Sequence, residues 1–377
     1  MSPSVCSRCS LDNALAHNDA DIRCAARSLT LAASLIATLY FLLHSIHARP
    51  SQTPATLEAN TKTAPYVPPI WAQPEPPFVT KVTALFSRND LYERVLATHE
   101  AHNSLNGYAL SVLRERITKE WWSQAAHLLS MVVSELAKPE SQRTKWLLWF
   151  QPDVVVLNEQ IPLEIFLPSG PGLEDIHFLA SHDDYGQMDS GVFFLRVHEW
   201  TVKLLVEVLA LPRTASALQH TLRKDRFAMA SVIGSPKFRA SVFYQPRHWY
   251  NAYALSADST EYEKGDLQLH FHNAAGDRWR GVSQALDLLS TTPSDFSIPL
   301  EETTYANDTQ AYWGRVRTAK SLLKLTAGKA YGKETQNALD RLSYATNYEA
   351  DKGKVLQDAI DGLSKALGLG ASDEAAL

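Results

Sequence analysis

The chain has 377 residues, of which 45% are hydrophobic and 10% aromatic, and its formal net charge at pH 7 is -5. This length and apolar content are enough to bury one large core or two modest ones. The net charge is slightly acidic, and the Lys and Arg residues are not clustered into a basic block. The sequence therefore gives no sign of a nucleic-acid-binding surface. We therefore predict a globular protein that does not bind nucleic acid.

An apolar segment near the amino terminus predicts a membrane helix. Residues 28–46 contain no Asp, Glu, Lys or Arg. A helix of this length is long enough to cross a hydrocarbon core of ~30 Å. Arg8, Arg23 and Arg27 precede it, so the positive-inside rule predicts a cytoplasmic tail over residues 1–27. A cleaved signal peptide is the alternative, but the apolar run is long, starts late and lacks a small-residue cleavage site. We predict a transmembrane signal anchor in a type II protein.

All three cysteines, Cys6, Cys9 and Cys24, precede this segment. The remainder of the chain therefore cannot be held together by disulfides. Cys6 and Cys9 have the CxxC spacing of a zinc site, but no second ligand pair follows, which favours a reduced tail open to acylation over zinc. Residues 47–78 are rich in proline and predict an extended stalk between the membrane and the following domain.

From residue 79 onward, strand-like and helix-like patterns alternate, which predicts an α/β fold. The predicted strands are 81–86, 109–113, 146–150, 154–157, 176–180, 192–197, 240–244 and 267–271. The predicted helices are 91–105, 120–137 and 199–209. The composition changes near residue 283, and residues 310–366 are expected to be helical throughout. We divide this part of the chain into a domain at 79–290 and a helical C-terminal extension at 291–377, which is a cap or an oligomerisation element.

A polar notch, Gln151-Pro152-Asp153, interrupts the most apolar stretch between residues 146–150 and 154–157. Pro152 has no amide hydrogen for a strand ladder, so a buried strand of a parallel sheet is expected to end there. Asp153 would then stand at the carboxyl end of a central strand, where open α/β sheets bind ligands. A carboxylate there can hold a divalent cation against a phosphate. An ordinary polar turn at the end of a strand explains the stretch at least as well.

Three further segments place polar or aromatic side chains beside predicted strands. The loop 183–191 brings acidic groups to the mouth of a strand. Segment 245–253 is an aromatic-rich loop of the kind that can stack on a sugar. His270 ends an alternating strand and could join Asp153 on Mn²⁺ or another transition ion. Each segment also has a purely structural explanation, as a turn, as core aromatics and as a strand-end histidine.

Several familiar catalytic motifs are absent. The first predicted strand is not followed by a phosphate-binding Gly-rich fingerprint, and the sequence has no GxSxG elbow and no HExxH helix. His99 and His102 are close enough to share one helix face, but no third metal ligand accompanies them. We interpret them as part of an ordinary polar helix face.

Together and in this order, these segments resemble glycosyltransferase family 34. That family contains fungal α-galactosyltransferases and α-1,6-mannosyltransferases of the Golgi, along with plant xyloglucan xylosyltransferases. The matching segments are 96–108, 146–158, 161–168, 190–200, 249–253 and 265–271. They are collinear from about residue 79 to residue 288, which is far more specific than any one motif.

The resemblance implies a GT-A fold, a single Rossmann-like α/β domain with a nucleotide-binding half and an acceptor-binding half. It implies retaining transfer of a hexose or pentose from a UDP-sugar or GDP-mannose to an acceptor glycan. The likeness to the fungal members favours a hexose, galactose or mannose, from UDP-galactose or GDP-mannose. Mn²⁺ or another divalent cation would bridge an acidic DxD motif to the donor diphosphate. It further implies a Golgi or ER membrane with a luminal catalytic domain, with which the N-glycosylation sequon at Asn307 agrees. A homo- or hetero-oligomer with other glycosyltransferases fits this setting.

The resemblance also assigns roles to particular residues. The expected metal ligands are Asp153 and His270. The expected nucleotide-sugar contacts are Gln151, Asp153, Gly265 and Asp266. The expected catalytic carboxylates are Asp184 and Asp189. The expected substrate contacts are Trp249, Tyr250 and Asn251.

Four positions near this site depart from the family pattern. Gln151 replaces the first carboxylate of DxD and brings hydrogen bonding without charge. Asp189 replaces an asparagine, Arg226 replaces a glutamine, and Asn273 replaces a glycine that allows close backbone approach. Two predictions follow from these departures. The chain is either an active metal-dependent transferase with an altered donor site, or a catalytically inactive relative that serves as subunit or partner of an active glycosyltransferase.

Overall fold

The computed structural model describes residues 76–87, 89–118, 122–211, 224–256, 259–260, 262–272 and 278–369. They fall within one compact unit, residues 72–377. The predicted tail, the predicted anchor at 28–46 and most of the predicted stalk lie outside the described residues. Among the helices that are described, none combines the length and the apolar character needed to cross a membrane.

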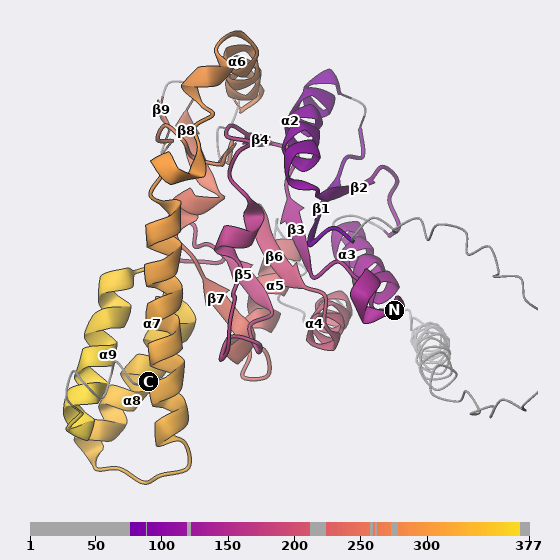
Figure 1. The fold of residues 1–377 in the computed structure, drawn as a ribbon. Coiled ribbons are helices and arrows are strands. Elements are labelled where there is room, and N and C mark those ends of the chain that lie inside the picture. Colours follow the sequence, from indigo (N-terminus) through magenta and orange to yellow (C-terminus); the bar gives the residue numbers. More distant parts are fainter. Residues whose placement is uncertain are drawn as a thin grey trace, which may run out of the picture. The chain divides into compact units, whose positions relative to one another are not determined.

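Within the described residues, the larger of two sheets has six strands in the order β2-β1-β3-β6-β5-β7 (Figure 1). Its strands are β1 (Val79–Ala84), β2 (Ala109–Leu113), β3 (Trp146–Phe150), β5 (Phe178–Ala180), β6 (Val192–Arg196) and β7 (Val242–Tyr244). Each lies within two residues of a strand predicted from the sequence, so the mixed α/β class is confirmed.

The direction of β6 corrects the expectation that the apolar run at 146–150 lies in a parallel sheet. β3 is parallel to β1 but antiparallel to its other neighbour, β6. The reason lies in the connection that precedes β6. Residues 181–191 return the chain from β5 to β6 as a hairpin, and a parallel pairing would need a longer crossover.

The second sheet has four strands in the order β4-β10-β8-β9. They are β4 (Val154–Val156), β8 (Ala252–Ser256), β9 (Ser259–Thr260) and β10 (Gln268–His270). The notch at residues 151–153 is therefore the point at which the chain leaves the large sheet after β3 and enters the small sheet as β4. Pro152 separates two strands that belong to different sheets.

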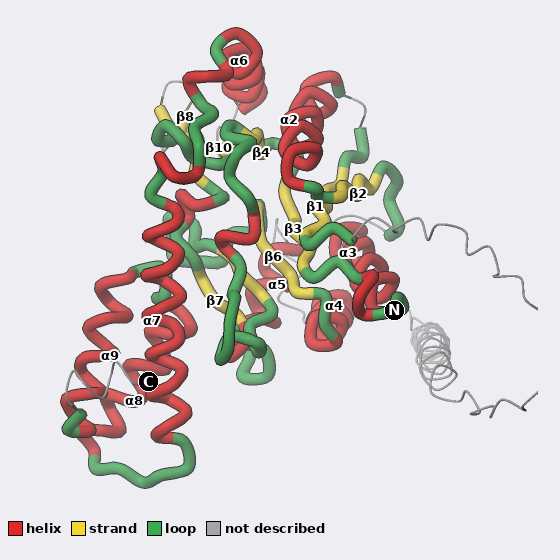
Figure 2. The backbone as a smooth tube through the Cα atoms, in the orientation of Figure 1, coloured by secondary structure: helices red, strands yellow, loops and turns green. Residues whose placement is uncertain are grey.

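Helices cover both faces of the large sheet (Figures 1 and 2). The helices of the first part are α2 (Asp90–Asn106), α3 (Trp122–Leu136), α4 (Glu199–Ala210), α5 (Lys224–Ile233) and α6 (Arg278–Thr291). Alternate side chains of β3 point to opposite faces. Leu147 and Trp149 pack in the core that α3, α4 and α5 cover, whereas Trp146, Leu148 and Phe150 pack in the core that the C-terminal helices cover.

The C-terminal extension consists of α7 (Tyr305–Thr326), α8 (Lys333–Tyr348) and α9 (Gly353–Leu367). The expectation of continuous helix over 310–366 was wrong at residues 327–332 and 349–352, where turns allow the three helices to fold back on one another. The apolar face of α7 joins the core beneath β3, with Val316 and Leu322 fully buried there. The extension is thus part of the main core.

His99 and His102 of α2 point into the core, and the expectation of a polar helix face was wrong. The Nε2 atoms donate to the carbonyl oxygens of Val154 and Ile161, each at 2.8 Å. Both Nδ1 atoms are then left to accept from the buried ammonium of Lys81, at 3.5 Å from His99 and 2.5 Å from His102. The physical reason is Lys81 itself, because a fully buried lysine on β1 requires acceptors on the helix that covers it.

Candidate active site

Asp153 lies at the notch between the two sheets and is only 3% exposed. Its Oδ1 atom is 3.6 Å from Nε2 of His270, at the end of β10. Its Oδ2 atom is 3.2 Å from a guanidinium nitrogen of Arg278, the first residue of α6. A backbone hydrogen bond also holds the two segments together, because the amide of Phe271 donates to the carbonyl oxygen of Asp153 at 3.0 Å. The structure thus brings together the two side chains that were expected to share a metal ion.

Asn251 determines which ring nitrogen of His270 carries the proton. The amide nitrogen of Asn251 donates to the hydroxyl of Ser181 at 2.8 Å, which leaves its oxygen to accept from Nδ1 of His270, also at 2.8 Å. Nδ1 therefore bears a hydrogen, and in the neutral ring Nε2 presents its lone pair towards Asp153. Asn251 is fully buried. It supports the histidine, whereas the sequence had assigned it to the substrate.

Two buried acceptor atoms face each other here without a donor. Among the described residues, neither Oδ1 of Asp153 nor Nε2 of His270 has a hydrogen-bond partner. A buried carboxylate oxygen and a buried imidazole lone pair 3.6 Å apart are costly unless a cation or a donor lies near both. Nitrogen and oxygen ligands of this kind suit Mn²⁺ and other divalent transition ions.

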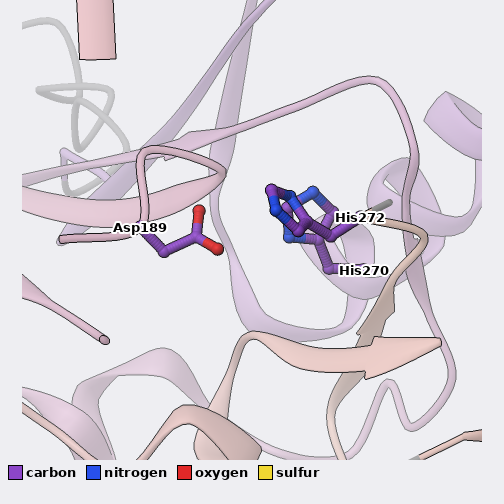
Figure 3. Close-up of side chains that lie close together, drawn as sticks. All are labelled: Asp189, His270 and His272. Atoms are coloured by element: carbon purple, nitrogen blue, oxygen red, sulfur yellow. The ribbon is translucent and has the colours of Figure 1, made fainter. Parts of the chain in front are cut away.

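Asp189 places a second buried carboxylate beside His270 (Figure 3). Its carboxylate points towards His270 and His272, and the ligand atoms of the three residues lie within 4.8 Å of one another. One oxygen accepts from the hydroxyl of Tyr253, and the other accepts from the amide of Gly191 at 2.5 Å. Burial alone would raise the pKa of Asp189, but the charge that His270 carries when it is protonated outweighs it together with the hydrogen bonds from the Tyr253 hydroxyl and the Gly191 amide, so the pKa is lowered. Asp189 is therefore ionised at neutral pH.

Gly191 makes room for the His270 ring. A Cβ atom at this position would lie 2.1 Å from Cε1 and 2.7 Å from Nδ1 of that ring. The carbonyl oxygen of Gly191 also accepts from the amide of Gln151 at 2.9 Å. The start of β6, the notch and the end of β10 are thus fixed to one another, and a side chain on residue 191 would force them apart.

Asp184, Gly265, Asp266 and Gln151 were also expected at the site. Asp184 is exposed and pairs with Arg247 at 2.7 Å. Gly265 and Asp266 precede β10, whereas His270 ends it. Burial raises the pKa of Asp266 to about 6. Gln151 is half-buried within the notch itself.

Trp249 and Tyr250 are core residues, and their burial does not fit the expected contact with substrate. They are 1% and 0% exposed. Both pack against Phe166, and Trp249 also meets the Tyr312 ring of α7 with ring centroids 5.3 Å apart. The sequence pattern of an aromatic loop could not reveal that α7 covers it.

The sequence did not single out His272, Tyr253 and Arg278 as site residues, although Tyr253 lies in the predicted aromatic segment 245–253. A signal existed for His272, because residues 270 and 272 are two apart in extended chain and therefore share a face. The ring of His272 is stacked on that of Tyr253, with centroids 4.8 Å apart. Arg278 had no such signal, since its place depends on how α6 packs.

The family model of the galactosyl transferase GMA12/MNN10 family matches residues 167–276. This segment contains Asp189 and His270 and ends just before Arg278. Among curated proteins, none matches the chain.

Several solved structures resemble parts of the fold. A glycosyltransferase involved in the glycosylation of the major capsid of PBCV-1 is 17% identical with a TM-score of 0.40, over 55% of this chain and 98% of that chain. The catalytic domain of Drosophila beta1,4galactosyltransferase 7 with xylobiose is 12% identical with a TM-score of 0.23, over 33% of this chain and 51% of that chain. A mutant of that Drosophila enzyme with manganese, UDP-Gal and xylobiose is 14% identical with a TM-score of 0.21, over 32% and 49%. Residues 167–276 of this chain are therefore similar to the galactosyl transferase GMA12/MNN10 family of glycosyltransferases.

Proposed function

We propose that this protein transfers a hexose, galactose or mannose, from a nucleotide sugar to an acceptor glycan, with retention and with help from a divalent metal ion. The observation that carries the proposal is the pair of unpartnered buried acceptors, Oδ1 of Asp153 and Nε2 of His270, 3.6 Å apart. It occurs in a chain whose sequence matches a galactosyl transferase family. We propose that the two sheets form a GT-A-like nucleotide-sugar domain around this pair.

Asp153 and His270 are the residues that would hold the metal ion, Mn²⁺ in our proposal. When bound, such an ion neutralises the negative charge that builds up on the donor diphosphate as the glycosidic bond breaks. Asn251 holds Nδ1 of His270 as the donor, so the neutral ring turns its Nε2 lone pair towards the ion. Arg278 adds a guanidinium at the same edge, and its planar donor fork suits phosphate oxygens. Gln151 supplies hydrogen-bonding groups to the ribose of the nucleotide.

Asp189 is the carboxylate that we assign to the reaction centre. It is ionised and buried beside His270, held by Tyr253 and by the amide of Gly191. A fixed anion of this kind stabilises the positive charge that develops on the transferred sugar. Asp184, the other predicted catalytic carboxylate, pairs with Arg247 at the surface. We therefore assign it to the acceptor side.

Binding and turnover measured on the full chain test the proposal. We expect Mn²⁺ to bind by titration calorimetry and to permit binding of UDP-galactose or GDP-mannose. Asp153→Asn should remove the heat of Mn²⁺ binding and lower donor hydrolysis by at least roughly 100-fold, because the loss of a residue that only supports a metal ligand already costs about 10–100-fold. Asp287→Asn is the matched control, because Asp287 pairs with Arg94 on the surface of α6. If no nucleotide sugar binds with or without metal, the proposal is wrong.

A second candidate is a non-catalytic relative that serves as subunit or partner of an active glycosyltransferase. The observation that favours it is Arg278, whose guanidinium lies 3.2 Å from Oδ2 of Asp153 and already neutralises that carboxylate. Gln151 is uncharged, so it does not replace the negative charge of Asp153 that Arg278 neutralises. This candidate predicts that the Arg278–Asp153 pair persists when Mn²⁺ is added. It also predicts that the chain neither binds nor hydrolyses a nucleotide-sugar donor, and that an active transferase co-purifies with it.

We also propose that the protein is a single-pass type II protein of the Golgi or ER membrane, with residues 79–377 in the lumen. Support comes from the uncharged apolar run at 28–46 and from the arginines before it. The sequon residue Asn307 is exposed in the first turn of α7, where an oligosaccharide transferred in the lumen would point to solvent.

A further inference from the structure

A hollow opens between the loops of the sheet domain and the C-terminal helices. Its volume is about 1120 Å³, slightly above the ~300–1,000 Å³ range of typical small-molecule sites. The loops 182–186, 246–248 and 263–266 contribute to one wall. The end of α8 and the turn before α9, residues 344–352, contribute to the other. We call this hollow the interhelical cleft.

Two tyrosines give the interhelical cleft an aromatic surface. Tyr344 and Tyr348 lie one helical turn apart on α8, with ring centroids 5.0 Å apart and ring planes inclined by 33°. Tyr344 is 54% exposed, and both residues line the cleft. An exposed aromatic face in a hollow is a surface on which the C–H face of a pyranose ring can pack.

The charges of the interhelical cleft argue against an anionic ligand. Its acidic side chains outnumber its lysines and arginines. The acidic side chains are Asp183, Asp184, Glu263, Asp266, Glu302, Glu349 and Asp351. The cations are Arg247, Lys264 and Lys352. A nucleotide diphosphate would meet a net negative wall, whereas a neutral polyhydroxylated ligand finds many hydrogen-bond acceptors and some donors.

The interhelical cleft is connected to Asp189 through two side chains. Arg247 lines the cleft, and its guanidinium carbon lies 4.0 Å from the centre of the Tyr253 ring. The hydroxyl of Tyr253 in turn donates to Asp189. One aromatic ring therefore separates the wall of the cleft from the carboxylate that we assign to the reaction centre.

We propose that the interhelical cleft binds the oligosaccharide acceptor, and that Tyr344 and Tyr348 form its stacking platform. The inference rests on the proposed glycosyl transfer and assigns acceptor recognition to α8, outside the segment that matches the family. The aromatic platform packs against sugar rings, while the surrounding carboxylates and cations bind their hydroxyl groups. The C-terminal helices thereby select the glycan that is extended.

Oligosaccharide binding to the full chain, measured without donor, tests the inference. Mannotriose and galactotriose are titrated separately by calorimetry. We expect at least one to bind, and Tyr344→Ala to weaken that binding roughly tenfold, about the loss of one stacked ring. Tyr344→Phe keeps the ring and should bind within about twofold of the unaltered chain. Tyr331→Ala is the matched control, because Tyr331 lies in the α7–α8 loop and does not line the interhelical cleft.

The outcomes separate this inference from the proposed function. Equal binding by the unaltered chain and by Tyr344→Ala overturns the inference, and so does a failure of both trisaccharides to bind. Binding of UDP-galactose and GDP-mannose in the presence of Mn²⁺ is measured on the same samples. Donor binding that persists while Tyr344→Ala has no effect on the trisaccharide refutes the acceptor cleft alone. Trisaccharide binding without any donor binding refutes the proposed transfer and leaves the cleft as a glycan-binding site.

Discussion

At the scale of single residues, the candidate site depends on a supporting contact for each functional side chain. Asn251 fixes the tautomer of His270, and Tyr253 holds Asp189. Gly191 contributes by the side chain that it lacks. Residues of this kind commonly affect metal affinity by about 10–100-fold although they do not touch the metal.

Gly191→Ala is the sharpest test of this support. The added methyl group must displace the His270 ring, because a Cβ atom on residue 191 would lie only 2.1 Å from Cε1 of that ring. We expect Mn²⁺ affinity, measured by calorimetry, to fall at least about tenfold while circular dichroism shows a folded chain. Gly314→Ala is the control, since a Cβ there has nothing within 4 Å. An unchanged Mn²⁺ affinity in Gly191→Ala would mean that His270 is not a ligand.

The sequence pattern identified Asp153 and His270 correctly as neighbours, because each ends an apolar run at the same edge of the fold. It misassigned Trp249, Tyr250 and Asn251, whose burial depends on residues far away in the chain. A loop rich in aromatic residues has the same sequence whether it is exposed or covered. Only the position of Tyr312 on α7 decides between the two.

At the scale of elements, β1 and α2 are joined by a buried basic cluster, Lys81, His99 and His102. Burial lowers the pKa of Lys81, and burial together with the Lys81 charge lowers the pKa of both histidines, that of His102 to about 3. These groups are stable inside the fold only when the histidines are neutral. The cluster is therefore a source of acid sensitivity in this part of the sheet.

The sign of the effect follows from the folded pKa of His102 lying below its unfolded value of about 6.5. Its contribution to stability is fully present above pH 6.5 and is lost as the pH falls towards 3, because the unfolded chain binds the proton first. Each such histidine lowers the free energy of unfolding by about 1.4 kcal/mol per pH unit in this window.

His102→Gln should therefore reduce the acid dependence of stability by about one proton, as measured by urea unfolding at pH 7, 6, 5 and 4. The variant is expected to be less stable than the unaltered chain at pH 7, because it loses the buried hydrogen bond between Lys81 and Nδ1 of His102. His248→Gln is the control, since His248 is exposed. Equal slopes for the unaltered chain and His102→Gln would contradict a neutral, buried His102.

At the scale of the whole molecule, the C-terminal helices and the sheets share one core. Leu322 of α7 is fully buried in the same cluster as Leu148 and Phe150 of β3, whereas Leu325 on the same helix is 42% exposed. A shared core predicts that the extension and the sheet domain unfold together.

Leu322→Ala should lower the free energy of unfolding by about 2–5 kcal/mol in a single transition, because it leaves a cavity in the common core. Leu325→Ala should change it by less than about 0.5 kcal/mol. Denaturant unfolding followed by circular dichroism and by tryptophan fluorescence measures both. Two separated transitions, with only the first shifted by Leu322→Ala, would show that the extension is an independent unit.

The proposed membrane topology makes a prediction about Asn307. If residues 79–377 face the lumen, the full chain expressed in a eukaryotic cell should carry an oligosaccharide at Asn307, and endoglycosidase treatment should increase its gel mobility. Asn307→Gln should abolish that shift, while Asn337→Gln, at an exposed asparagine that is not within a sequon, should retain it. Digestion of the domain by protease added outside intact microsomes would contradict the luminal placement.

The sequence by itself determined where most strands and helices lie, because hydrophobic periodicity is a local property of each segment. It also indicated that Asp153 and His270 meet, because both end runs that must be buried. Only the tertiary structure decided the direction of β6, the burial of Trp249 and Tyr250, and the pairing of Lys81 with two histidines. It alone revealed the interhelical cleft, whose walls are far apart in sequence. Each of these depends on contacts between distant segments, and the local pattern of residues does not specify which segments will pack together.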